Sequence, residues 1–157
     1  MKLEETRQSL LMFLQGLNVA EWHTAVQTED AAWNVADIVR HLINAEKGMT
    51  GLIEQFQQGN NPVPPDFDRE RYNRRAVEKT ATMTPPEVLA ALAENRTHLR
   101  QVIAGLTAED WQKKGRHASL RIMTVEEVLQ MIADHEQAHL EEMQQRIQGG
   151  TDTRLVE

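Results

Sequence analysis

Residues Thr124 to Gln148 place apolar side chains three or four positions apart, which is the spacing of one helix face. A capping-box pattern opens this segment, and two glycines follow it. The same period recurs in three other segments, Leu3 to Leu17, Val35 to Gln58 and Pro85 to Ala104. Few aromatic and only scattered β-branched residues argue against a sandwich or barrel. The sequence therefore predicts an all-α protein built as a four-helix bundle.

The connectors are long for a simple up-and-down bundle. Roughly two dozen residues separate the second and third predicted helices, and they include the proline-rich run Asn61 to Pro65. We expect a short extra helix over Arg69 to Lys79 in this connector. A long crossover connection can span the bundle, so the second and third helices can be parallel, but the hydrophobic period leaves the topology open. We expect one domain over residues 1–150 and a frayed tail over residues 151–157.

Composition excludes several classes of function. The 157 residues contain no cysteine, so thiolate metal sites, disulfides and thiol nucleophiles are excluded. The formal net charge of −7 and the lack of a dense basic cluster argue against nucleic acid as a partner. The acidic start of the chain and the short apolar run Leu10 to Leu14 do not resemble a signal peptide or a membrane span. We therefore expect a soluble cytoplasmic protein.

The fourth predicted helix changes character along its core-facing side. Its apolar stripe continues, at the same spacing, into His135, Glu136, His139 and Glu142. Burying polar groups there is unfavourable unless they have partners. Two imidazoles at i and i+4 lie about 5–6 Å apart on one face, so both can reach one ion at about 2.0–2.1 Å. This pattern favours a divalent metal site of histidine and carboxylate ligands.

His41 is the best candidate for a third ligand, because it lies beside the apolar stripe near the start of the second helix. Asp37, one turn earlier, is placed to fix the tautomer of His41. A hydrogen-bonded boundary histidine is the simpler interpretation of His41 taken alone. Asn73, Arg74 and His117 are candidates for lining the mouth of the site from the connectors, although ordinary capping or solvation is the favoured interpretation of these polar groups.

Residues His135 to His139 also read as H-E-x-x-H, the zinc-protease motif with Glu136 as general base. The extended protease motif fails, because Glu142 and Gln145 stand where a glycine and a third histidine are required. A histidine pair that is merely hydrogen-bonded in a metal-free bundle is a further alternative. The core-facing stripe favours the metal site over both.

Four stretches, in order, resemble the DinB/YfiT-like superfamily. Trp33 to Leu42 resembles the opening of its second helix, and Asp134 to Met143 resembles its closing H-x-x-x-H-l-x-Q-i signature. Phe67 to Asn73 and the connector from Trp111 to His117 are weaker matches. The resemblance covers nearly the whole chain, although each motif is loose alone.

The resemblance implies a four-helix bundle with unusual connectivity and one metal ion held by His41, His135 and His139. It also implies frequent homodimers and relatives that include thiol-dependent transferases and a mycothiol-dependent maleylpyruvate isomerase. The chain departs from the family at Glu142, where glutamine is common, and at Ala118, where proline is common. Zinc or nickel is the expected ion, and iron, copper or manganese remain alternatives.

Together these features predict a metal-dependent transferase or hydrolase that acts on a small molecule, with a metal-bound water or a low-molecular-weight thiol as nucleophile. Glu136 is the first candidate for moving the proton, and Glu142 is its alternative or a partner of a ligand. A surface carboxylate is an equal interpretation of Glu136. The alternative function is a non-catalytic, stress-associated module with a structural or sensory metal.

Overall fold

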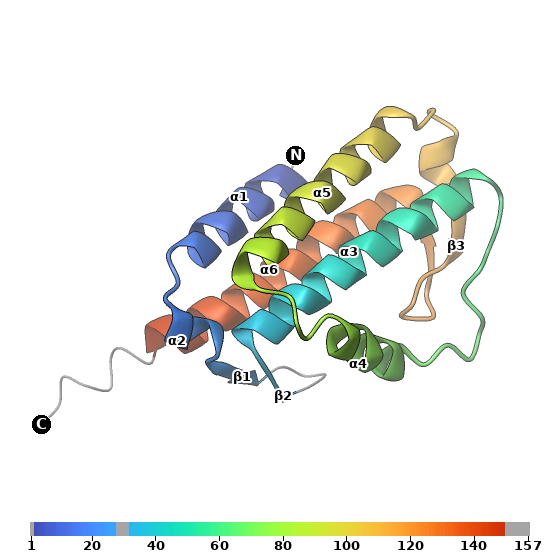
Figure 1. Cartoon of the computed structure of the whole chain (residues 1–157). Helices are drawn as coiled ribbons and strands as arrows, with labels where there is room; N and C mark the ends of the chain where they lie inside the picture. The colour runs from blue at the N-terminus through green and yellow to red at the C-terminus, as the bar shows by residue number, and fades with distance from the viewer. Residues whose placement is uncertain (1, 28–31, 150–157) are drawn as a thin grey trace, which may run out of the picture.

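The computed structural model describes residues 2–27 and 32–149; the predicted tail, residues 151–157, lies outside them. Four long helices form the bundle: α1 (Lys2–Gln15), α3 (Val35–Gln57), α5 (Pro85–Ala104) and α6 (Val125–Gly149). Figure 1 shows that α1 and α6 run in one direction and α3 and α5 in the other. The predicted four-helix bundle is confirmed, and α3 and α5 are parallel because the connector between them spans the bundle.

Several short elements connect the long helices. α4 (Arg69–Lys79) has the predicted bounds, whereas α2 (Val19–Trp22) and the 3-10 helix η1 (Asp110–Gln112) were not predicted. Two antiparallel hairpins were not predicted either, because three-residue strands are too short to show a period. They pair β1 (Ala25–Gln27) with β2 (Ala32–Asn34) and β3 (Lys114–Arg116) with β4 (Ile122–Thr124).

Gly115 allows the second hairpin to lie against the end of α3. A Cβ atom at this position would overlap the ring of Phe56, which is fully buried. Only glycine permits this close approach of the backbone to the ring. The hairpin is thereby held at the end of α3, and His117 directly follows its first strand, β3.

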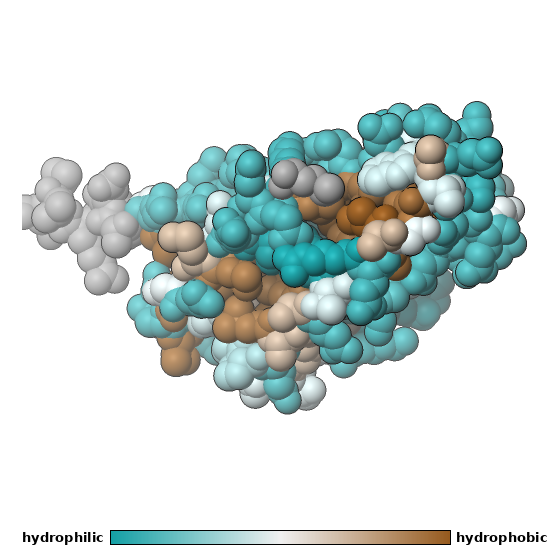
Figure 2. Space-filling model, turned by 90° about the horizontal axis from the view of Figure 1, so that it is seen from above, coloured by the Kyte–Doolittle hydropathy of each residue, from teal (hydrophilic) through white to brown (hydrophobic). Residues whose placement is uncertain are grey.

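The core has two apolar parts with a layer of charge between them. One part includes Leu10, Ile43, Leu92 and Leu140, and the other includes Leu3, Met49, Leu99 and Ala133. Along each long helix one buried charged residue lies between members of the two parts; these residues are Arg7, Glu46, Arg96 and Glu136. We call them the four-charge network. On the face seen in Figure 2, hydrophobic residues also gather in two areas with hydrophilic residues between them.

Within residues 2–27 and 32–149, every helix is too short or too polar to cross a lipid bilayer.

Candidate metal centre

α3 and α6 bring His41, His135 and His139 together, and we call these residues the histidine cluster. The Nε2 atom of His135 lies 3.0 Å from that of His41 and 3.2 Å from that of His139. A tetrahedral ion with bonds of about 2.0–2.1 Å holds its nitrogen ligands about 3.3 Å apart. Two of the three separations are close to this value, and ligand nitrogens of all three residues lie within 4.8 Å of one another, so the cluster can hold one divalent ion.

Local sequence explains why the rings meet. His135 and His139 are one turn apart on α6, so they project from the same face. On α3, Asn34 accepts the Asp37 N–H and fixes the first turn, which places His41 opposite that face. The ring of His41 meets that of His135 edge to face, with centroids 4.8 Å apart, and it packs beside Trp33 at 5.0 Å.

Glu142 orients one member of the cluster. Its Oε2 lies 2.8 Å from His139 Nδ1, so the Nδ1–H group donates a hydrogen bond to the carboxylate. The other ring nitrogen, Nε2, then carries no proton, and its lone pair is available to a metal ion. Asp37, the expected partner of His41, has other partners. Its Oδ2 accepts the Asn34 N–H and its Oδ1 accepts from Arg40. A carboxylate one turn away in the sequence therefore identified the hydrogen-bond partner of the histidine correctly on α6 but not on α3.

The surroundings keep two members of the cluster, His41 and His135, uncharged. Burial lowers the pKa of His41 to about 3, with smaller effects of His139 and Arg69 in the same direction. Burial also lowers the pKa of His135 to about 2, and the neighbouring histidines and Arg69 add to this effect. Neutral imidazole is the form that binds metal, so at neutral pH these two ligands need not release protons before an ion binds.

Glu136 faces away from the histidine cluster. Arg7 Nε donates to its Oε1 at 2.8 Å, and Arg96 lies 3.5 Å from its Oε2. Its carboxylate is therefore part of the four-charge network, between α6 and the helices α1 and α5. Its role in moving a proton stays a prediction, and these contacts favour a structural role instead.

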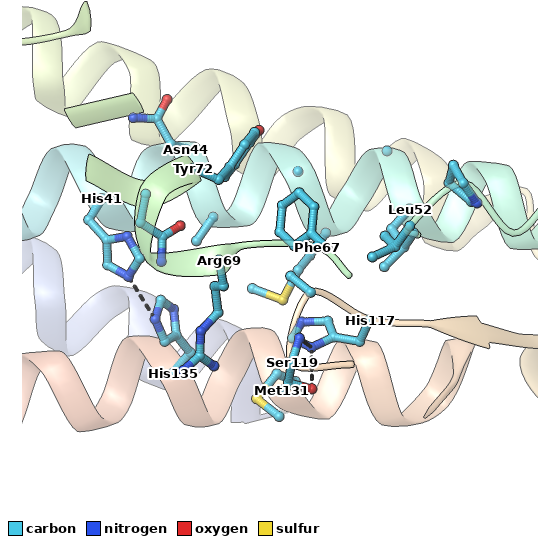
Figure 3. Close-up of a pocket in the computed structure, with 18 of the residues that line it drawn as sticks. His41, Asn44, Leu52, Phe67, Arg69, Tyr72, His117, Ser119, Met131 and His135 are labelled. Carbon is cyan, nitrogen blue, oxygen red and sulfur yellow. Dashed lines mark hydrogen bonds between the residues drawn. The ribbon is translucent and has the colours of Figure 1, made fainter. Parts of the chain in front are cut away.

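A cavity of about 490 Å³ opens beside His41 and His135. Figure 3 shows its lining, which comes from α3, α6, α4 and the connectors. Most of the lining is apolar, and it includes Met49, Leu52, Val63, Phe67 and Met131. An apolar hollow with a few polar groups at one end is the usual form of a small-molecule site.

The connectors contribute some of the predicted residues to this cavity. Asn73 and His117 line it, whereas Arg74 lies by a separate shallow site on the outside of α4. His117 is buried, and its Nδ1 accepts the Ser119 N–H at 3.0 Å. Burial, aided by Arg69 and Arg121, lowers the pKa of His117. His117 is therefore a neutral imidazole with its proton on Nε2.

The sequence analysis missed several polar residues of the cavity, among them Arg69 and Tyr72 on α4. Figure 3 shows the Arg69 side chain extending from α4 toward His135. Arg69, Tyr72 and Asn73 stand at i, i+3 and i+4, so they share one face of α4. This spacing was readable from the predicted helix, but nothing in the sequence showed which way that face points.

Comparisons with known proteins agree with this architecture. The chain matches the DinB superfamily over residues 2–143. No curated protein sequence matches the chain. Three solved structures have the same fold at low sequence identity.

The structure of mycothiol-dependent maleylpyruvate isomerase is 14% identical with a TM-score of 0.73; the match covers 90% of this chain but only 59% of that one. YfiT from Bacillus subtilis, described as a probable metal-dependent hydrolase with an unusual four-helix bundle topology, is 21% identical with a TM-score of 0.73 over 93% of this chain and 83% of that one. A protein described as a four-helix bundle is 19% identical with a TM-score of 0.67 over 91% and 93%. The chain belongs to the DinB superfamily.

Proposed function

We propose that this protein is a metal-dependent enzyme of the transferase or hydrolase type, in which His41, His135 and His139 hold one divalent ion. The observation that carries the proposal is the convergence of three Nε2 atoms beside an apolar cavity. Bound there, the ion would supply Lewis acidity that lowers the pKa of a water or thiol. Zinc or nickel suits three imidazoles, and a homodimer in the cytoplasm remains our expectation.

The chain's own groups support such chemistry. Glu142 fixes the His139 tautomer, and burial keeps His41 and His135 neutral. His117, with its proton on Nε2, can donate a hydrogen bond to a substrate acceptor in the cavity. Apolar walls exclude water from the rest of the substrate, which strengthens each polar contact. Glu142, partly buried and next to a ligand, is the nearest carboxylate for receiving a proton.

A low-molecular-weight thiol is the nucleophile that we favour, because one structural relative depends on mycothiol. Water is the alternative nucleophile, because YfiT is described as a probable hydrolase. The competing function, a non-catalytic module, needs a closed shell of four protein ligands. Within residues 2–27 and 32–149 the group of converging donors contains three members, which favours an ion with an open position.

Elemental analysis tests the site. We expect near one divalent ion per chain after reloading with zinc or nickel, and its loss in His135→Ala and in His139→Ala with the bundle still folded by circular dichroism. His98→Ala is the matched control, since His98 is exposed and pairs with Glu54. Retention of the ion in both cluster variants, or no binding in the wild type, would refute the proposal.

Activity is tested separately from binding. The metal-loaded protein is assayed for thiol transfer to 1-chloro-2,4-dinitrobenzene and for hydrolysis of p-nitrophenyl acetate. We expect one of the two rates to depend on the ion and on His135. If metal binds at the cluster but neither rate changes across a wider panel of electrophiles and esters, the non-catalytic function is the better one.

A further inference from the structure

A second hollow lies next to the metal cavity. It has a volume of about 710 Å³ and lies between α3 and α4. Asn44, Gly48 and Tyr72 line both this groove and the metal cavity, so the two hollows share a wall. Figure 3 shows Asn44 and Tyr72 side by side at the edge of the metal cavity.

The groove is basic although the chain is acidic. Its charged lining consists of four cations, Lys47, Arg71, Arg75 and Lys79, and one acid, Asp68. Asp68 Oδ1 accepts the Arg71 N–H at the start of α4, so this carboxylate already has a partner. In the part of the chain that the structure describes, none of the four cationic side chains forms an ion pair or hydrogen bond.

The spacing of these cations is unfavourable for the helix itself. Arg71, Arg75 and Lys79 stand at i, i+4 and i+8, so their like charges stack along one face of α4. Like charges at i and i+4 destabilise a helix. A helix face that only contacts water gains nothing from this row of three cations. An anion bound in the groove would offset the repulsion between them.

Gly48 lines both hollows and has no side chain, so the wall between them is low at this position. Glycine inside a helix destabilises it by about 1 kcal/mol relative to alanine. Packing does not require it at this position, because no atom lies within 4 Å of where its Cβ would be. The space beside Gly48 belongs to the two hollows, so a molecule could pass along α3 from one to the other.

We propose that this groove is a second binding subsite, which takes a multiply anionic part of the molecule whose reactive end lies at the histidine cluster. The anionic groups would be carboxylates or phosphates, paired with Lys47, Arg71, Arg75 and Lys79. This inference rests on the proposed function, and it adds that the substrate has two parts, one reactive and one anionic.

Matched thiols on the cobalt-loaded protein test the inference, because thiolate bound to cobalt absorbs in the near ultraviolet. Glutathione is compared with its diethyl ester, which lacks the carboxylate charges and keeps the ammonium group, and 4′-phosphopantetheine is compared with pantetheine, which lacks the phosphate. We expect at least one anionic thiol to bind about fivefold or more tightly than its counterpart without the anionic group. The pair that shows the difference identifies carboxylate or phosphate as the preferred group.

The double variant Arg71→Gln, Arg75→Gln should remove most of this advantage and leave the affinity for uncharged pantetheine unchanged. Arg74→Gln, on α4 but outside the groove, should retain it. If the anionic thiols and their counterparts without anionic groups bind equally well, or if the advantage survives in the double variant, the groove is not a subsite. If no thiol produces the absorption band, the thiol form of the proposed function fails, and this inference fails with it.

Discussion

Two buried polar clusters lie one beside the other on α3 and α6, and they satisfy their polar groups in opposite ways. The four-charge network pairs two arginines with two glutamates and is neutral as a unit. The histidine cluster instead brings imidazole nitrogens together, and within residues 2–27 and 32–149 this group contains no carboxylate. The first cluster balances its charges within the chain, whereas we propose that a metal ion completes the second.

Most polar atoms of the network are hydrogen-bonded; the exceptions are Arg96 Nη2 and Glu136 Oε2, which lie 3.5 Å apart as an ion pair. Arg7 donates to Glu136 and pairs with Glu46, and Arg96 Nε donates to Glu46 at 2.9 Å. The remaining guanidinium groups donate to the carbonyls of Leu92 and Leu3, which join α1 to α5. Burial lowers the pKa of Arg7, but Glu136 and Glu46 more than offset this, so its pKa is raised.

The contrast shows that sequence neighbours can serve different purposes. Glu136 lies next to His135 in the H-E-x-x-H string, yet its side chain belongs to the network. Glu142, outside that string, contacts His139. Four changes, from the largest expected effect to the smallest, test whether the two clusters are as different as their contacts indicate.

The largest effect should come from Glu46→Gln, which removes one of the two charges that balance Arg7 and Arg96. Breaking a buried ion pair from one side typically destabilises a protein by about 3–5 kcal/mol. Urea unfolding measures the loss. Glu94→Gln, an exposed position on α5, is the matched control and should change stability by less than about 0.5 kcal/mol. A loss below about 1 kcal/mol for Glu46→Gln would show that the network is not a stabilising unit.

Zinc should next stabilise the wild type, because it binds only the folded arrangement of the histidines. At a free concentration of about 100 times Kd the gain is about 2.7 kcal/mol. The gain should vanish in His135→Ala and persist in Glu46→Gln, if that variant folds. Urea unfolding with and without zinc measures it. Equal gains in wild type and His135→Ala would place the zinc elsewhere.

Acid should destabilise the metal-free protein through the same histidines. Their folded pKa values, about 3 for His41 and about 2 for His135, lie below the usual 6.5. Below pH 6.5 the unfolded chain therefore binds protons that the folded chain does not. The free energy of unfolding decreases as the pH is lowered. The loss between pH 7 and 5.5 should be about 2 kcal/mol for the two residues.

Urea unfolding across this pH range measures the slope. His135→Gln should flatten it by about half, because one of the two titrating groups is removed. A slope that is unchanged in His135→Gln would show that other groups are responsible for it.

The smallest effect is expected for Glu142→Gln, which weakens the bond that orients His139. Losing a carboxylate partner of a metal-bound histidine reduces metal affinity by about tenfold or more. Competition with a chromogenic chelator measures the zinc Kd. Glu141→Gln is the control, because Glu141 is exposed and its side chain accepts from Gln137. An unchanged Kd in Glu142→Gln would mean that packing alone orients the ring.

Much of the fold was readable from the sequence. The capping box predicted at the start of α6 is present, because the Glu127 N–H donates to Thr124 Oγ1 and the Thr124 N–H donates to Glu127 Oε2. The hairpins were not readable, because their register depends on contacts such as Gly115 against Phe56 rather than on a local period. The orientation of α4, which brings Arg69 to the cavity, could not be predicted either, because it also depends on tertiary contacts.

The sequence by itself determined the long helices, the absence of thiol ligands and the pairing of His135 with His139, because helical period and residue type are local properties. Only the tertiary structure decided that His41 completes the cluster, that Glu136 belongs to the network and that α3 and α5 are parallel. Those facts depend on which helix faces which. The geometry of a single helix determines that two residues one turn apart lie on the same face. The packing of the whole core determines which residues of different helices make contact.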